Sequence, residues 1–435
     1  MNRFTLLFIL TFATSLRGEP PKVVLKRNPQ IQVATKCRQW KLRDLSKVAG
    51  GPLVGTNSYG INAADLDGDG DVDLVLTFQS GGKAIGGSSQ RFGSVYWLEN
   101  LTKKTRGVRA KEIPRFRARL IDDHQLTPKV AVIGPTIDGR PSVVVPCYLA
   151  GETIIYQSTK QMKWRKVRLK AEELKQPVRA LVVDMNQDGR KDIVVTSIAK
   201  SGKPLACFQA PNNGDRWHHL PINMDASALV GLDAADVDGD GDTDLVVASP
   251  QHDDPWLLRN LDGKGTRWKQ QAIRTHIRNA ARKFVGRRGV SQSHVRLIDV
   301  DRDGDLDCIE TSLDYGYAAW RENRGSAKSW RFRPIARMLT QSYSFDVGDI
   351  NQDGLPDIVV PANGARGIYT FFNQPNQKTW RVHFFDTRKV GLTWPNIVRL
   401  RDINKDGKLD VLASDWGRRP VVWLNTNVRN RLQLE

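Results

Sequence analysis

The sequence predicts an all-β protein, a seven-bladed β-propeller made of four-stranded antiparallel blades. Three observations lead to this prediction. An acidic motif recurs along the 435 residues, each copy leads into a β-branched apolar run, and a strand that begins with Trp or Phe comes before the next copy. The copies are 50 to 69 residues apart, which gives each unit enough chain for four short strands.

The recurring motif is DxDxDGxxD, with Asn allowed at its third position. Intact copies begin at Asp65, Asp184, Asp236, Asp299, Asp349 and Asp402. A degenerate seventh copy lies within residues 133–145, where Asp138-Gly139-Arg140 remains but the outer carboxylates are replaced. So many copies exceed chance, and they divide the chain into seven units.

Each unit carries signals for four strands. An apolar stretch such as 180–183 precedes the motif and a β-branched run such as 192–196 follows it, so the acidic loop joins two strands of a hairpin. A third stretch often ends with an aromatic residue and Asn, as in VYWLEN at 95–100, and a fourth begins with Trp or Phe, as at Trp268. Four antiparallel strands per unit form one blade.

The strand count predicts how the ring closes. After the last acidic loop only three strands follow, ending near 421–425, and the missing Trp-led strand is found at residues 40–45. We expect this N-terminal strand to complete the last blade and to cover its open edge. The expected organisation is a signal peptide at 1–18, a mobile lead-in at 19–39, the propeller at 40–427 and a C-terminal tail at 428–435.

The N-terminus has the pattern of a secretory signal. An apolar run at 4–16 follows Arg3, and Ala13 and Ser15 have the spacing that a signal peptidase accepts. A short buried helix is the alternative. The run is too short to span a bilayer, so we expect a secreted or periplasmic protein without a transmembrane segment.

Four cysteines are too few for a disulfide scaffold. Cys37, Cys147, Cys207 and Cys308 include no CxxC pair, which argues against zinc ribbons and thioredoxin-like chemistry. We expect buried free thiols, although the sequence leaves their pairing open.

The acidic loops have the donor pattern of a calcium site. Carboxylates at positions 1, 3 and 5 converge because Gly at position 6 permits a sharp turn, position 7 offers its backbone carbonyl, and position 9 adds a carboxylate. Hard oxygen donors favour calcium, and about six ions are expected. An EF-hand is excluded because position 12 is apolar in five of the six loops and strands flank them. Solvated acidic turns are the alternative.

The predicted ligands comprise positions 1, 3, 5, 7 and 9 of the six intact loops. They are Asp65, Asp67, Asp69, Asp71 and Asp73; Asp184, Asn186, Asp188, Arg190 and Asp192; Asp236, Asp238, Asp240, Asp242 and Asp244; Asp299, Asp301, Asp303, Asp305 and Asp307; Asp349, Asn351, Asp353, Leu355 and Asp357; Asp402, Asn404, Asp406, Lys408 and Asp410.

These repeats resemble the FG-GAP or VCBS family of calcium-binding propeller repeats, the family of the integrin α-subunit head. The bacterial VCBS-type variant is the closer comparison, because the Phe-Gly and Gly-Ala-Pro signatures of the integrin version are mostly absent and Tyr59-Gly60 is their nearest match. The resemblance implies a seven-bladed propeller whose cations are structural and make the hairpins rigid. It does not imply integrin ligands.

The charge distribution favours an acidic partner. The formal net charge is +19, and 24 of the 47 acidic residues lie in the motifs, which leaves the rest of the chain strongly basic. We expect an anionic polysaccharide or an acidic extracellular protein as ligand, no nucleic acid because the chain carries a secretory signal, and a monomer.

Ligand contact is expected on the face opposite the calcium loops, where the second-to-third loops and the connections between blades emerge. Solvated loop residues are the alternative for each candidate. The candidates are Trp416, Arg418, Arg419, Tyr315, Tyr317, Trp394, Arg287 and Arg288.

No catalytic constellation stands out, because the seven histidines fall in different blades and no GxSxG or HExxH motif occurs. The sequence therefore favours a secreted calcium-binding propeller that acts as an extracellular binding or adhesion module. The alternative is a carbohydrate-active enzyme, of polysaccharide lyase or sugar dehydratase type, with its site in the mouth of the propeller.

Overall fold

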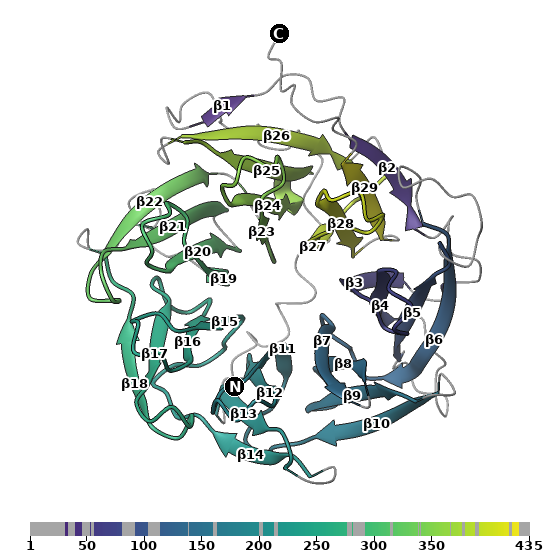
Figure 1. Cartoon of the computed structure of the whole chain (residues 1–435), viewed down its shortest axis with the longest axis horizontal. Coiled ribbons are helices and arrows are strands. Elements are labelled where there is room, and N and C mark those ends of the chain that lie inside the picture. Colours follow the sequence, from purple (N-terminus) through teal and green to yellow (C-terminus); the bar gives the residue numbers. More distant parts are fainter. Residues whose placement is uncertain are drawn as a thin grey trace, which may run out of the picture.

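The structure is a computed structural model in which seven sheets form a ring around a central axis (Figure 1). It describes residues 31–33, 40–45, 53, 56–80, 92–102, 114–137, 139–159, 163–199, 203–212, 216–275, 281, 292–313, 316–337, 339, 341–365, 367–375, 379–387, 391–416 and 420–425. The prediction of a seven-bladed, all-β propeller is confirmed.

Each blade is an antiparallel meander in which the first strand lies nearest the axis and the fourth lies outermost (Figure 1). Blade 1 contains β3 (Thr56–Ala64), β4 (Asp73–Ser80), β5 (Gly93–Asn100) and β6 (Phe116–Gln125); blade 2 contains β7 (Val132–Ile137), β8 (Arg140–Cys147), β9 (Glu152–Ser158) and β10 (Trp164–Leu169); blade 3 contains β11 (Pro177–Val183), β12 (Asp192–Ser197), β13 (Leu205–Gln209) and β14 (His218–Pro221).

The remaining blades follow the same order. Blade 4 contains β15 (Gly231–Ala235), β16 (Asp244–Ala248), β17 (Trp256–Asn260) and β18 (Trp268–Ala272); blade 5 contains β19 (Gln292–Ile298), β20 (Asp307–Ser312), β21 (Tyr317–Asn323) and β22 (Trp330–Arg337); blade 6 contains β23 (Asp346–Gly348), β24 (Asp357–Ala362), β25 (Gly367–Asn373) and β26 (Trp380–Asp386), with the 3-10 turn η2 (Asn363–Ala365) after β24; blade 7 contains β27 (Pro395–Arg401), β28 (Asp410–Asp415), β29 (Val421–Asn425) and the N-terminal β2 (Trp40–Asp44).

Blade 7 closes the ring with strands from both ends of the chain. β2 pairs with β29 in antiparallel register from Trp40↔Asn425 to Asp44↔Val421, and Leu45 N donates to Pro420 O at 3.0 Å. The predicted closure is therefore confirmed. A further strand, β1 (Ile31–Val33), lies inside the segment expected to be a lead-in and pairs in parallel with β26. The predicted signal peptide, the rest of the lead-in and the C-terminal tail lie outside the described residues.

The core consists of apolar layers within and between neighbouring blades. The second strands of blades 3 to 7 are buried along their whole length, as in β12 and β24, because each has a strand on either side and a blade against either face. Trp97, Trp320 and Trp380 are among the largest buried side chains. Inner strands instead carry irregularities, with register shifts such as Pro177/Arg179, Gln292/His294 and Pro395/Ile397, where the strand bends near the axis.

The three cysteines that the structure describes are buried and free. Cys147, Cys207 and Cys308 lie in β8, β13 and β20, where burial raises the pKa of each thiol and keeps it neutral. Cys37 lies outside the described residues. Within the described part of the chain, no helix has the length and apolar character needed to cross a membrane.

Candidate calcium loops and ligand face

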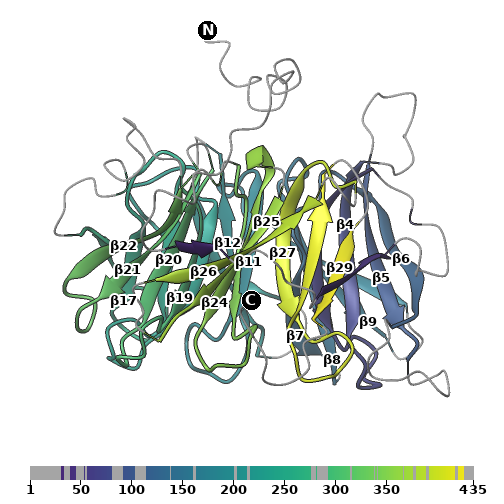
Figure 2. The same cartoon turned by 90° about the horizontal axis from the view of Figure 1, so that it is seen from above.

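Every intact acidic loop joins the first and second strands of its blade, so all six emerge from one face of the ring. Seen from the side, the strands run between the two faces of the disc (Figure 2). In all six loops the N–H of position 6 donates to a carboxylate oxygen of position 1, as Gly70 N does to Asp65 at 2.8 Å. Position 6 has a φ between +81° and +96° in all six loops, a left-handed conformation that explains its glycine.

The position 9 aspartates fasten each loop to its blade. All six are 0% exposed: Asp73, Asp192, Asp244, Asp307, Asp357 and Asp410. One oxygen accepts the N–H of position 2 and the other accepts the N–H at the end of the third strand, as Leu66 N (3.0 Å) and Asn100 N (2.7 Å) do with Asp73. Burial raises the pKa of Asp73 to about 7 and that of Asp307 to about 8, against these hydrogen bonds.

The Asn that ends the third strand connects neighbouring blades, a role that the sequence pattern did not reveal. Its side-chain amide donates to the position 2 carbonyl of the preceding blade's loop in four cases. The pairs are Asn260 to Met185 (3.4 Å), Asn323 to Val237 (3.4 Å), Asn373 to Val300 (3.0 Å) and Asn425 to Ile350 (3.0 Å). These bonds cross between blades beside the acidic loops, so loop geometry and ring packing are coupled.

Three of the loops gather carboxylates closely enough to share one metal ion. The ligand oxygens within each group lie within 4.8 Å of one another, and the groups are Asp65, Asp67 and Asp73; Asp236, Asp238 and Asp244; Asp299, Asp301 and Asp303. Oδ1 of Asp301 is buried without a hydrogen-bond partner among the described residues, and burial followed by the charge of Asp303 raises its pKa to about 6. Crowded, dehydrated carboxylates of this kind fit a hard divalent cation.

The loops also contact one another around the ring. Nε2 of Gln187, at position 4, donates to Gly241 O in the next blade at 2.6 Å, and Gln352 donates to Gly407 O at 2.7 Å. Lys405 reaches Gly70 O in the same way and so joins the last loop to the first. Sequence reasoning missed these contacts because position 4 varies freely within the motif and its partner lies about one blade further on.

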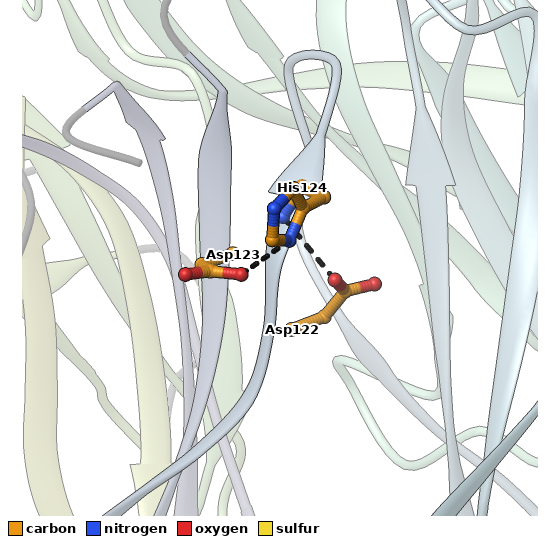
Figure 3. Close-up of side chains that lie close together, drawn as sticks. All are labelled: Asp122, Asp123 and His124. Atoms are coloured by element: carbon orange, nitrogen blue, oxygen red, sulfur yellow. Dashed lines mark hydrogen bonds and ion pairs between the residues drawn. The ribbon is translucent and has the colours of Figure 1, made fainter. Parts of the chain in front are cut away.

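A second acidic group lies outside the motif loops, at Asp122, Asp123 and His124 near the end of β6 (Figure 3). Burial alone would raise the pKa of Asp122, but the ammonium of Lys166 at 2.7 Å and the hydroxyl of Tyr156 at 2.7 Å hold it below its usual value. His124 turns its ring toward Asp123 (Figure 3). These partners account for the group without an ion.

The face opposite the acidic loops carries an aromatic and basic cluster. Trp416 follows β28, which starts at an acidic loop, so Trp416 lies at the other end of that strand. Its ring makes edge contacts with Tyr59 and Tyr343, each at 6.2 Å between centroids. Lys129 Nζ lies 4.5 Å from the ring centroid of Tyr59 and 4.7 Å from that of Tyr148.

We define the aromatic–lysine cluster as the five residues Tyr59, Lys129, Tyr148, Tyr343 and Trp416. They come from blades 1, 2, 6 and 7 and all are partly exposed. Only Trp416 was a sequence candidate, because the other four come from different blades and share no motif. Trp394 lies beside it, and its carbonyl accepts Trp416 N at 2.9 Å.

The other ligand candidates are placed differently. Tyr317 is 0% exposed inside blade 5, where its hydroxyl donates to Glu310 at 3.0 Å, so the structure does not bring it to either face. Glu310 also pairs with the buried Arg321 at 2.9 Å, which makes this a structural network. The remaining candidates lie outside the described residues: Arg287, Arg288, Tyr315, Arg418 and Arg419.

Comparison with known proteins supports the repeat assignment and the fold. Residues 184–247, 236–309 and 299–360 match the FG-GAP-like repeat, each match running from one acidic loop into the strand after the next. No curated protein matches the chain. A candidate 6-phosphogluconolactonase of Bacteroides uniformis is similar in structure, with 12% identity, 80% of this chain and 94% of the other covered, and a TM-score of 0.50.

Two further structures are similar at lower TM-scores. The periplasmic gluconolactonase of Pseudomonas aeruginosa shares 12% identity over 75% of this chain and 88% of its own, with a TM-score of 0.49. The CNH domain of AfRom2 shares 10% identity over 88% of this chain and 98% of its own, with a TM-score of 0.47. At such identities the likeness concerns the propeller fold and not the activity.

Proposed function

We propose that this chain, an FG-GAP-like repeat β-propeller, is a secreted, calcium-stabilised binding module that takes an acidic ligand on the face opposite its calcium loops. The repeats and the ring are its premise. Calcium at the six loops, about six ions in all, would neutralise their carboxylates and hold the hairpins rigid. Export through residues 1–18 would bring the chain to a compartment where calcium is plentiful.

The aromatic–lysine cluster is the observation that carries this proposal. Aromatic side chains and a cation, brought together from four blades, provide flat apolar surfaces for a sugar ring and a positive charge for its acid group. An anionic polysaccharide fits this combination best, and an acidic extracellular protein is the other expected ligand class. Nucleic acid is not expected, because the proposed export separates the chain from it.

Binding to an array of acidic polysaccharides in the presence of calcium tests the proposal. We expect Trp416→Ala to weaken binding about tenfold, because it removes the ring that contacts both Tyr59 and Tyr343. Leu261→Ala is the matched control, since Leu261 is 46% exposed and follows β17 at the calcium-loop end of its strand. Equal binding by both variants would contradict the placement of the ligand.

The same experiment addresses the enzyme alternative. A polysaccharide lyase would release unsaturated sugars that absorb in the ultraviolet, whereas a binding module would leave the polymer intact. Release of product that depends on the aromatic–lysine cluster would replace the proposed function with catalysis at the same place.

A further inference from the structure

Arginines from three inner strands converge where the blades meet at the ring axis. Arg179 lies on β11, Arg296 on β19, and Arg399 and Arg401 on β27, which belong to blades 3, 5 and 7 (Figure 1). Arg179 reaches across the ring, because it donates to Val230 O of blade 4 at 3.1 Å and to Tyr343 O of blade 6 at 2.8 Å.

The carboxylates at the axis are already engaged. Asp346 pairs with Arg296 at 3.1 Å and with Arg401 at 3.7 Å, and its Oδ2 also accepts Leu400 N at 2.9 Å. Asp233 lies 3.7 Å from Arg296 and accepts Leu297 N at 2.8 Å. Four guanidinium groups therefore face two carboxylates, so the axis keeps an excess of positive charge.

Among the described residues, neither Arg179 nor Arg399 forms an ion pair with a carboxylate. Among the described residues, Arg179 donates only to the two carbonyls named above and Arg399 only to Val398 O at 2.8 Å, although a guanidinium has five N–H donors. Both side chains keep some accessible surface. Burial lowers the pKa of Arg399 to about 9, with Asp346 opposing and the charges of Arg296 and Arg179 adding to the decrease.

His294 supplies an independent observation at the same place. It lies on β19 and is 6% exposed, and its Nδ1 has no hydrogen-bond partner among the described residues. Its ring lies 4.9 Å from that of Phe345, two residues along the chain from the Tyr343 carbonyl that accepts Arg179. Burial lowers the pKa of His294, and the charges of Arg179, Arg296 and Arg399 add to the decrease. A buried ring nitrogen without a partner fits a missing polar ligand.

We propose that Arg179, His294 and Arg399 bind an oxyanion at the axis of the ring, such as the carboxylate or sulfate group of an acidic sugar. The two arginines donate charge-assisted hydrogen bonds, and His294 donates through Nδ1 when the proton is on that nitrogen. The site goes beyond the proposed function, because it is formed by inner strands and binds a small anion without the side chains of the aromatic–lysine cluster; Tyr343 takes part only through the backbone carbonyl that accepts Arg179.

Calcium-saturated full-length protein is titrated with sulfate and with glucuronate. Glucose and chloride at the same concentrations are the uncharged and the anionic references. Binding is followed by calorimetry and by the melting temperature. We expect saturable binding of at least one of the two anions. Arg399→Gln should weaken it about tenfold, the loss of one charged hydrogen-bond donor. Arg168→Gln removes the same charge from an exposed outer-strand arginine and should bind as the original chain does.

The variant also has a readout that does not depend on the ligand. Without added oxyanion, Arg399→Gln should melt at the same temperature as the original chain or at a higher one, because the substitution removes a poorly compensated charge. In saturating sulfate or glucuronate, the variant should melt at a lower temperature than the original chain does in the same anion. Preference for sulfate or glucuronate identifies the acid group. Anion effects that are equal in all variants, or no binding by the original chain, would overturn the proposal. Trp416→Ala should leave this binding unchanged, which separates it from the proposed function.

Discussion

The six acidic loops are of two kinds, and the difference shows two ways of holding the same hairpin. The five-aspartate loops begin at Asp65, Asp236 and Asp299, and the three-aspartate loops begin at Asp184, Asp349 and Asp402. In the second kind, Asn replaces Asp at position 3 and Arg, Leu or Lys occupies position 7. The groups of carboxylates close enough to share an ion lie in the five-aspartate loops.

Neighbouring loops also contact one another through position 4. Each three-aspartate loop carries Gln or Lys at position 4, and this side chain reaches the position 6 carbonyl of the next loop. The loops that begin at Asp65 and Asp236 have Gly at position 4 and so lack such a side chain. We infer that these hydrogen bonds support the three-aspartate loops that donate them as well as the loops that accept them, and that the five-aspartate loops, with more carboxylates to repel one another, depend more on a cation.

Removing calcium should have the largest effect. Each ion bound only by the folded chain adds about 2.7 kcal/mol at a hundredfold excess over its Kd, so a chelator should lower the melting temperature strongly. Calorimetry with a count of bound metal should find about six ions in two affinity classes, the tighter one from the five-aspartate loops. A single affinity class would contradict the distinction between the two kinds of loop. A chain that binds no calcium would contradict the calcium proposal itself.

Substitution at position 9 should affect both loop types equally. Asp307→Ala leaves two backbone N–H groups without their acceptor and Asp357→Ala leaves at least two, at a cost of about 3 kcal/mol each in the free energy of unfolding. Because the loss is structural, urea unfolding should show it in chelator as well as in calcium. A loss seen only with calcium would mean that position 9 acts through the ion alone.

A histidine outside the acidic loops should make the stability of the chain depend on pH. Burial lowers the pKa of His383 to about 4, so the unfolded chain binds the extra proton first and the stability falls as the pH drops from 6.5 toward 4. His383→Gln should remove about 1 kcal/mol of this loss at about pH 5.5, measured by urea unfolding. A change no larger than that caused by the same substitution at His218, an exposed position on β14, would contradict the assignment to His383.

The contact between loops should have the smallest effect. Gln352→Ala removes one exposed hydrogen bond to Gly407 O and should cost about 0.5–1 kcal/mol, with Gln187→Ala similar. If the three-aspartate loops are supported by their neighbours, this loss should be larger in chelator than in calcium. Equal losses of stability in calcium and in chelator would show that the hydrogen bond between the loops and the bound ion act independently.

The sequence predicts those features that repeat. Strand order, blade number, the positions of the acidic loops and closure by Trp40–Asp44 all follow from one motif and a count of strands. Contacts across the axis could not be predicted in this way. Arg179 and Tyr343 are 164 positions apart and meet only because the ring brings blades 3 and 6 to face each other.

The aromatic–lysine cluster, on the face opposite the acidic loops, could likewise not be predicted from the repeated motif. Trp416 was a candidate because it occupies a second-to-third loop. Tyr59 lies near the start of an inner strand and Tyr343 just before another, where the sequence pattern indicates only ordinary strand residues. Tyr317 illustrates the opposite case, since an aromatic residue at the start of a strand can turn inward to a buried carboxylate instead of outward.

The pairing of β2 with β29 sets an order of events during synthesis. β2 leaves the ribosome before the strands of blades 1 to 6 and its partner leaves after them, so blade 7 cannot assemble until the rest of the propeller has been synthesised. Until then both strands have free edges that could pair with another copy. A chain shortened before Val421 would never cover them, and we expect such a product to be found in aggregates or domain-swapped pairs rather than as closed rings.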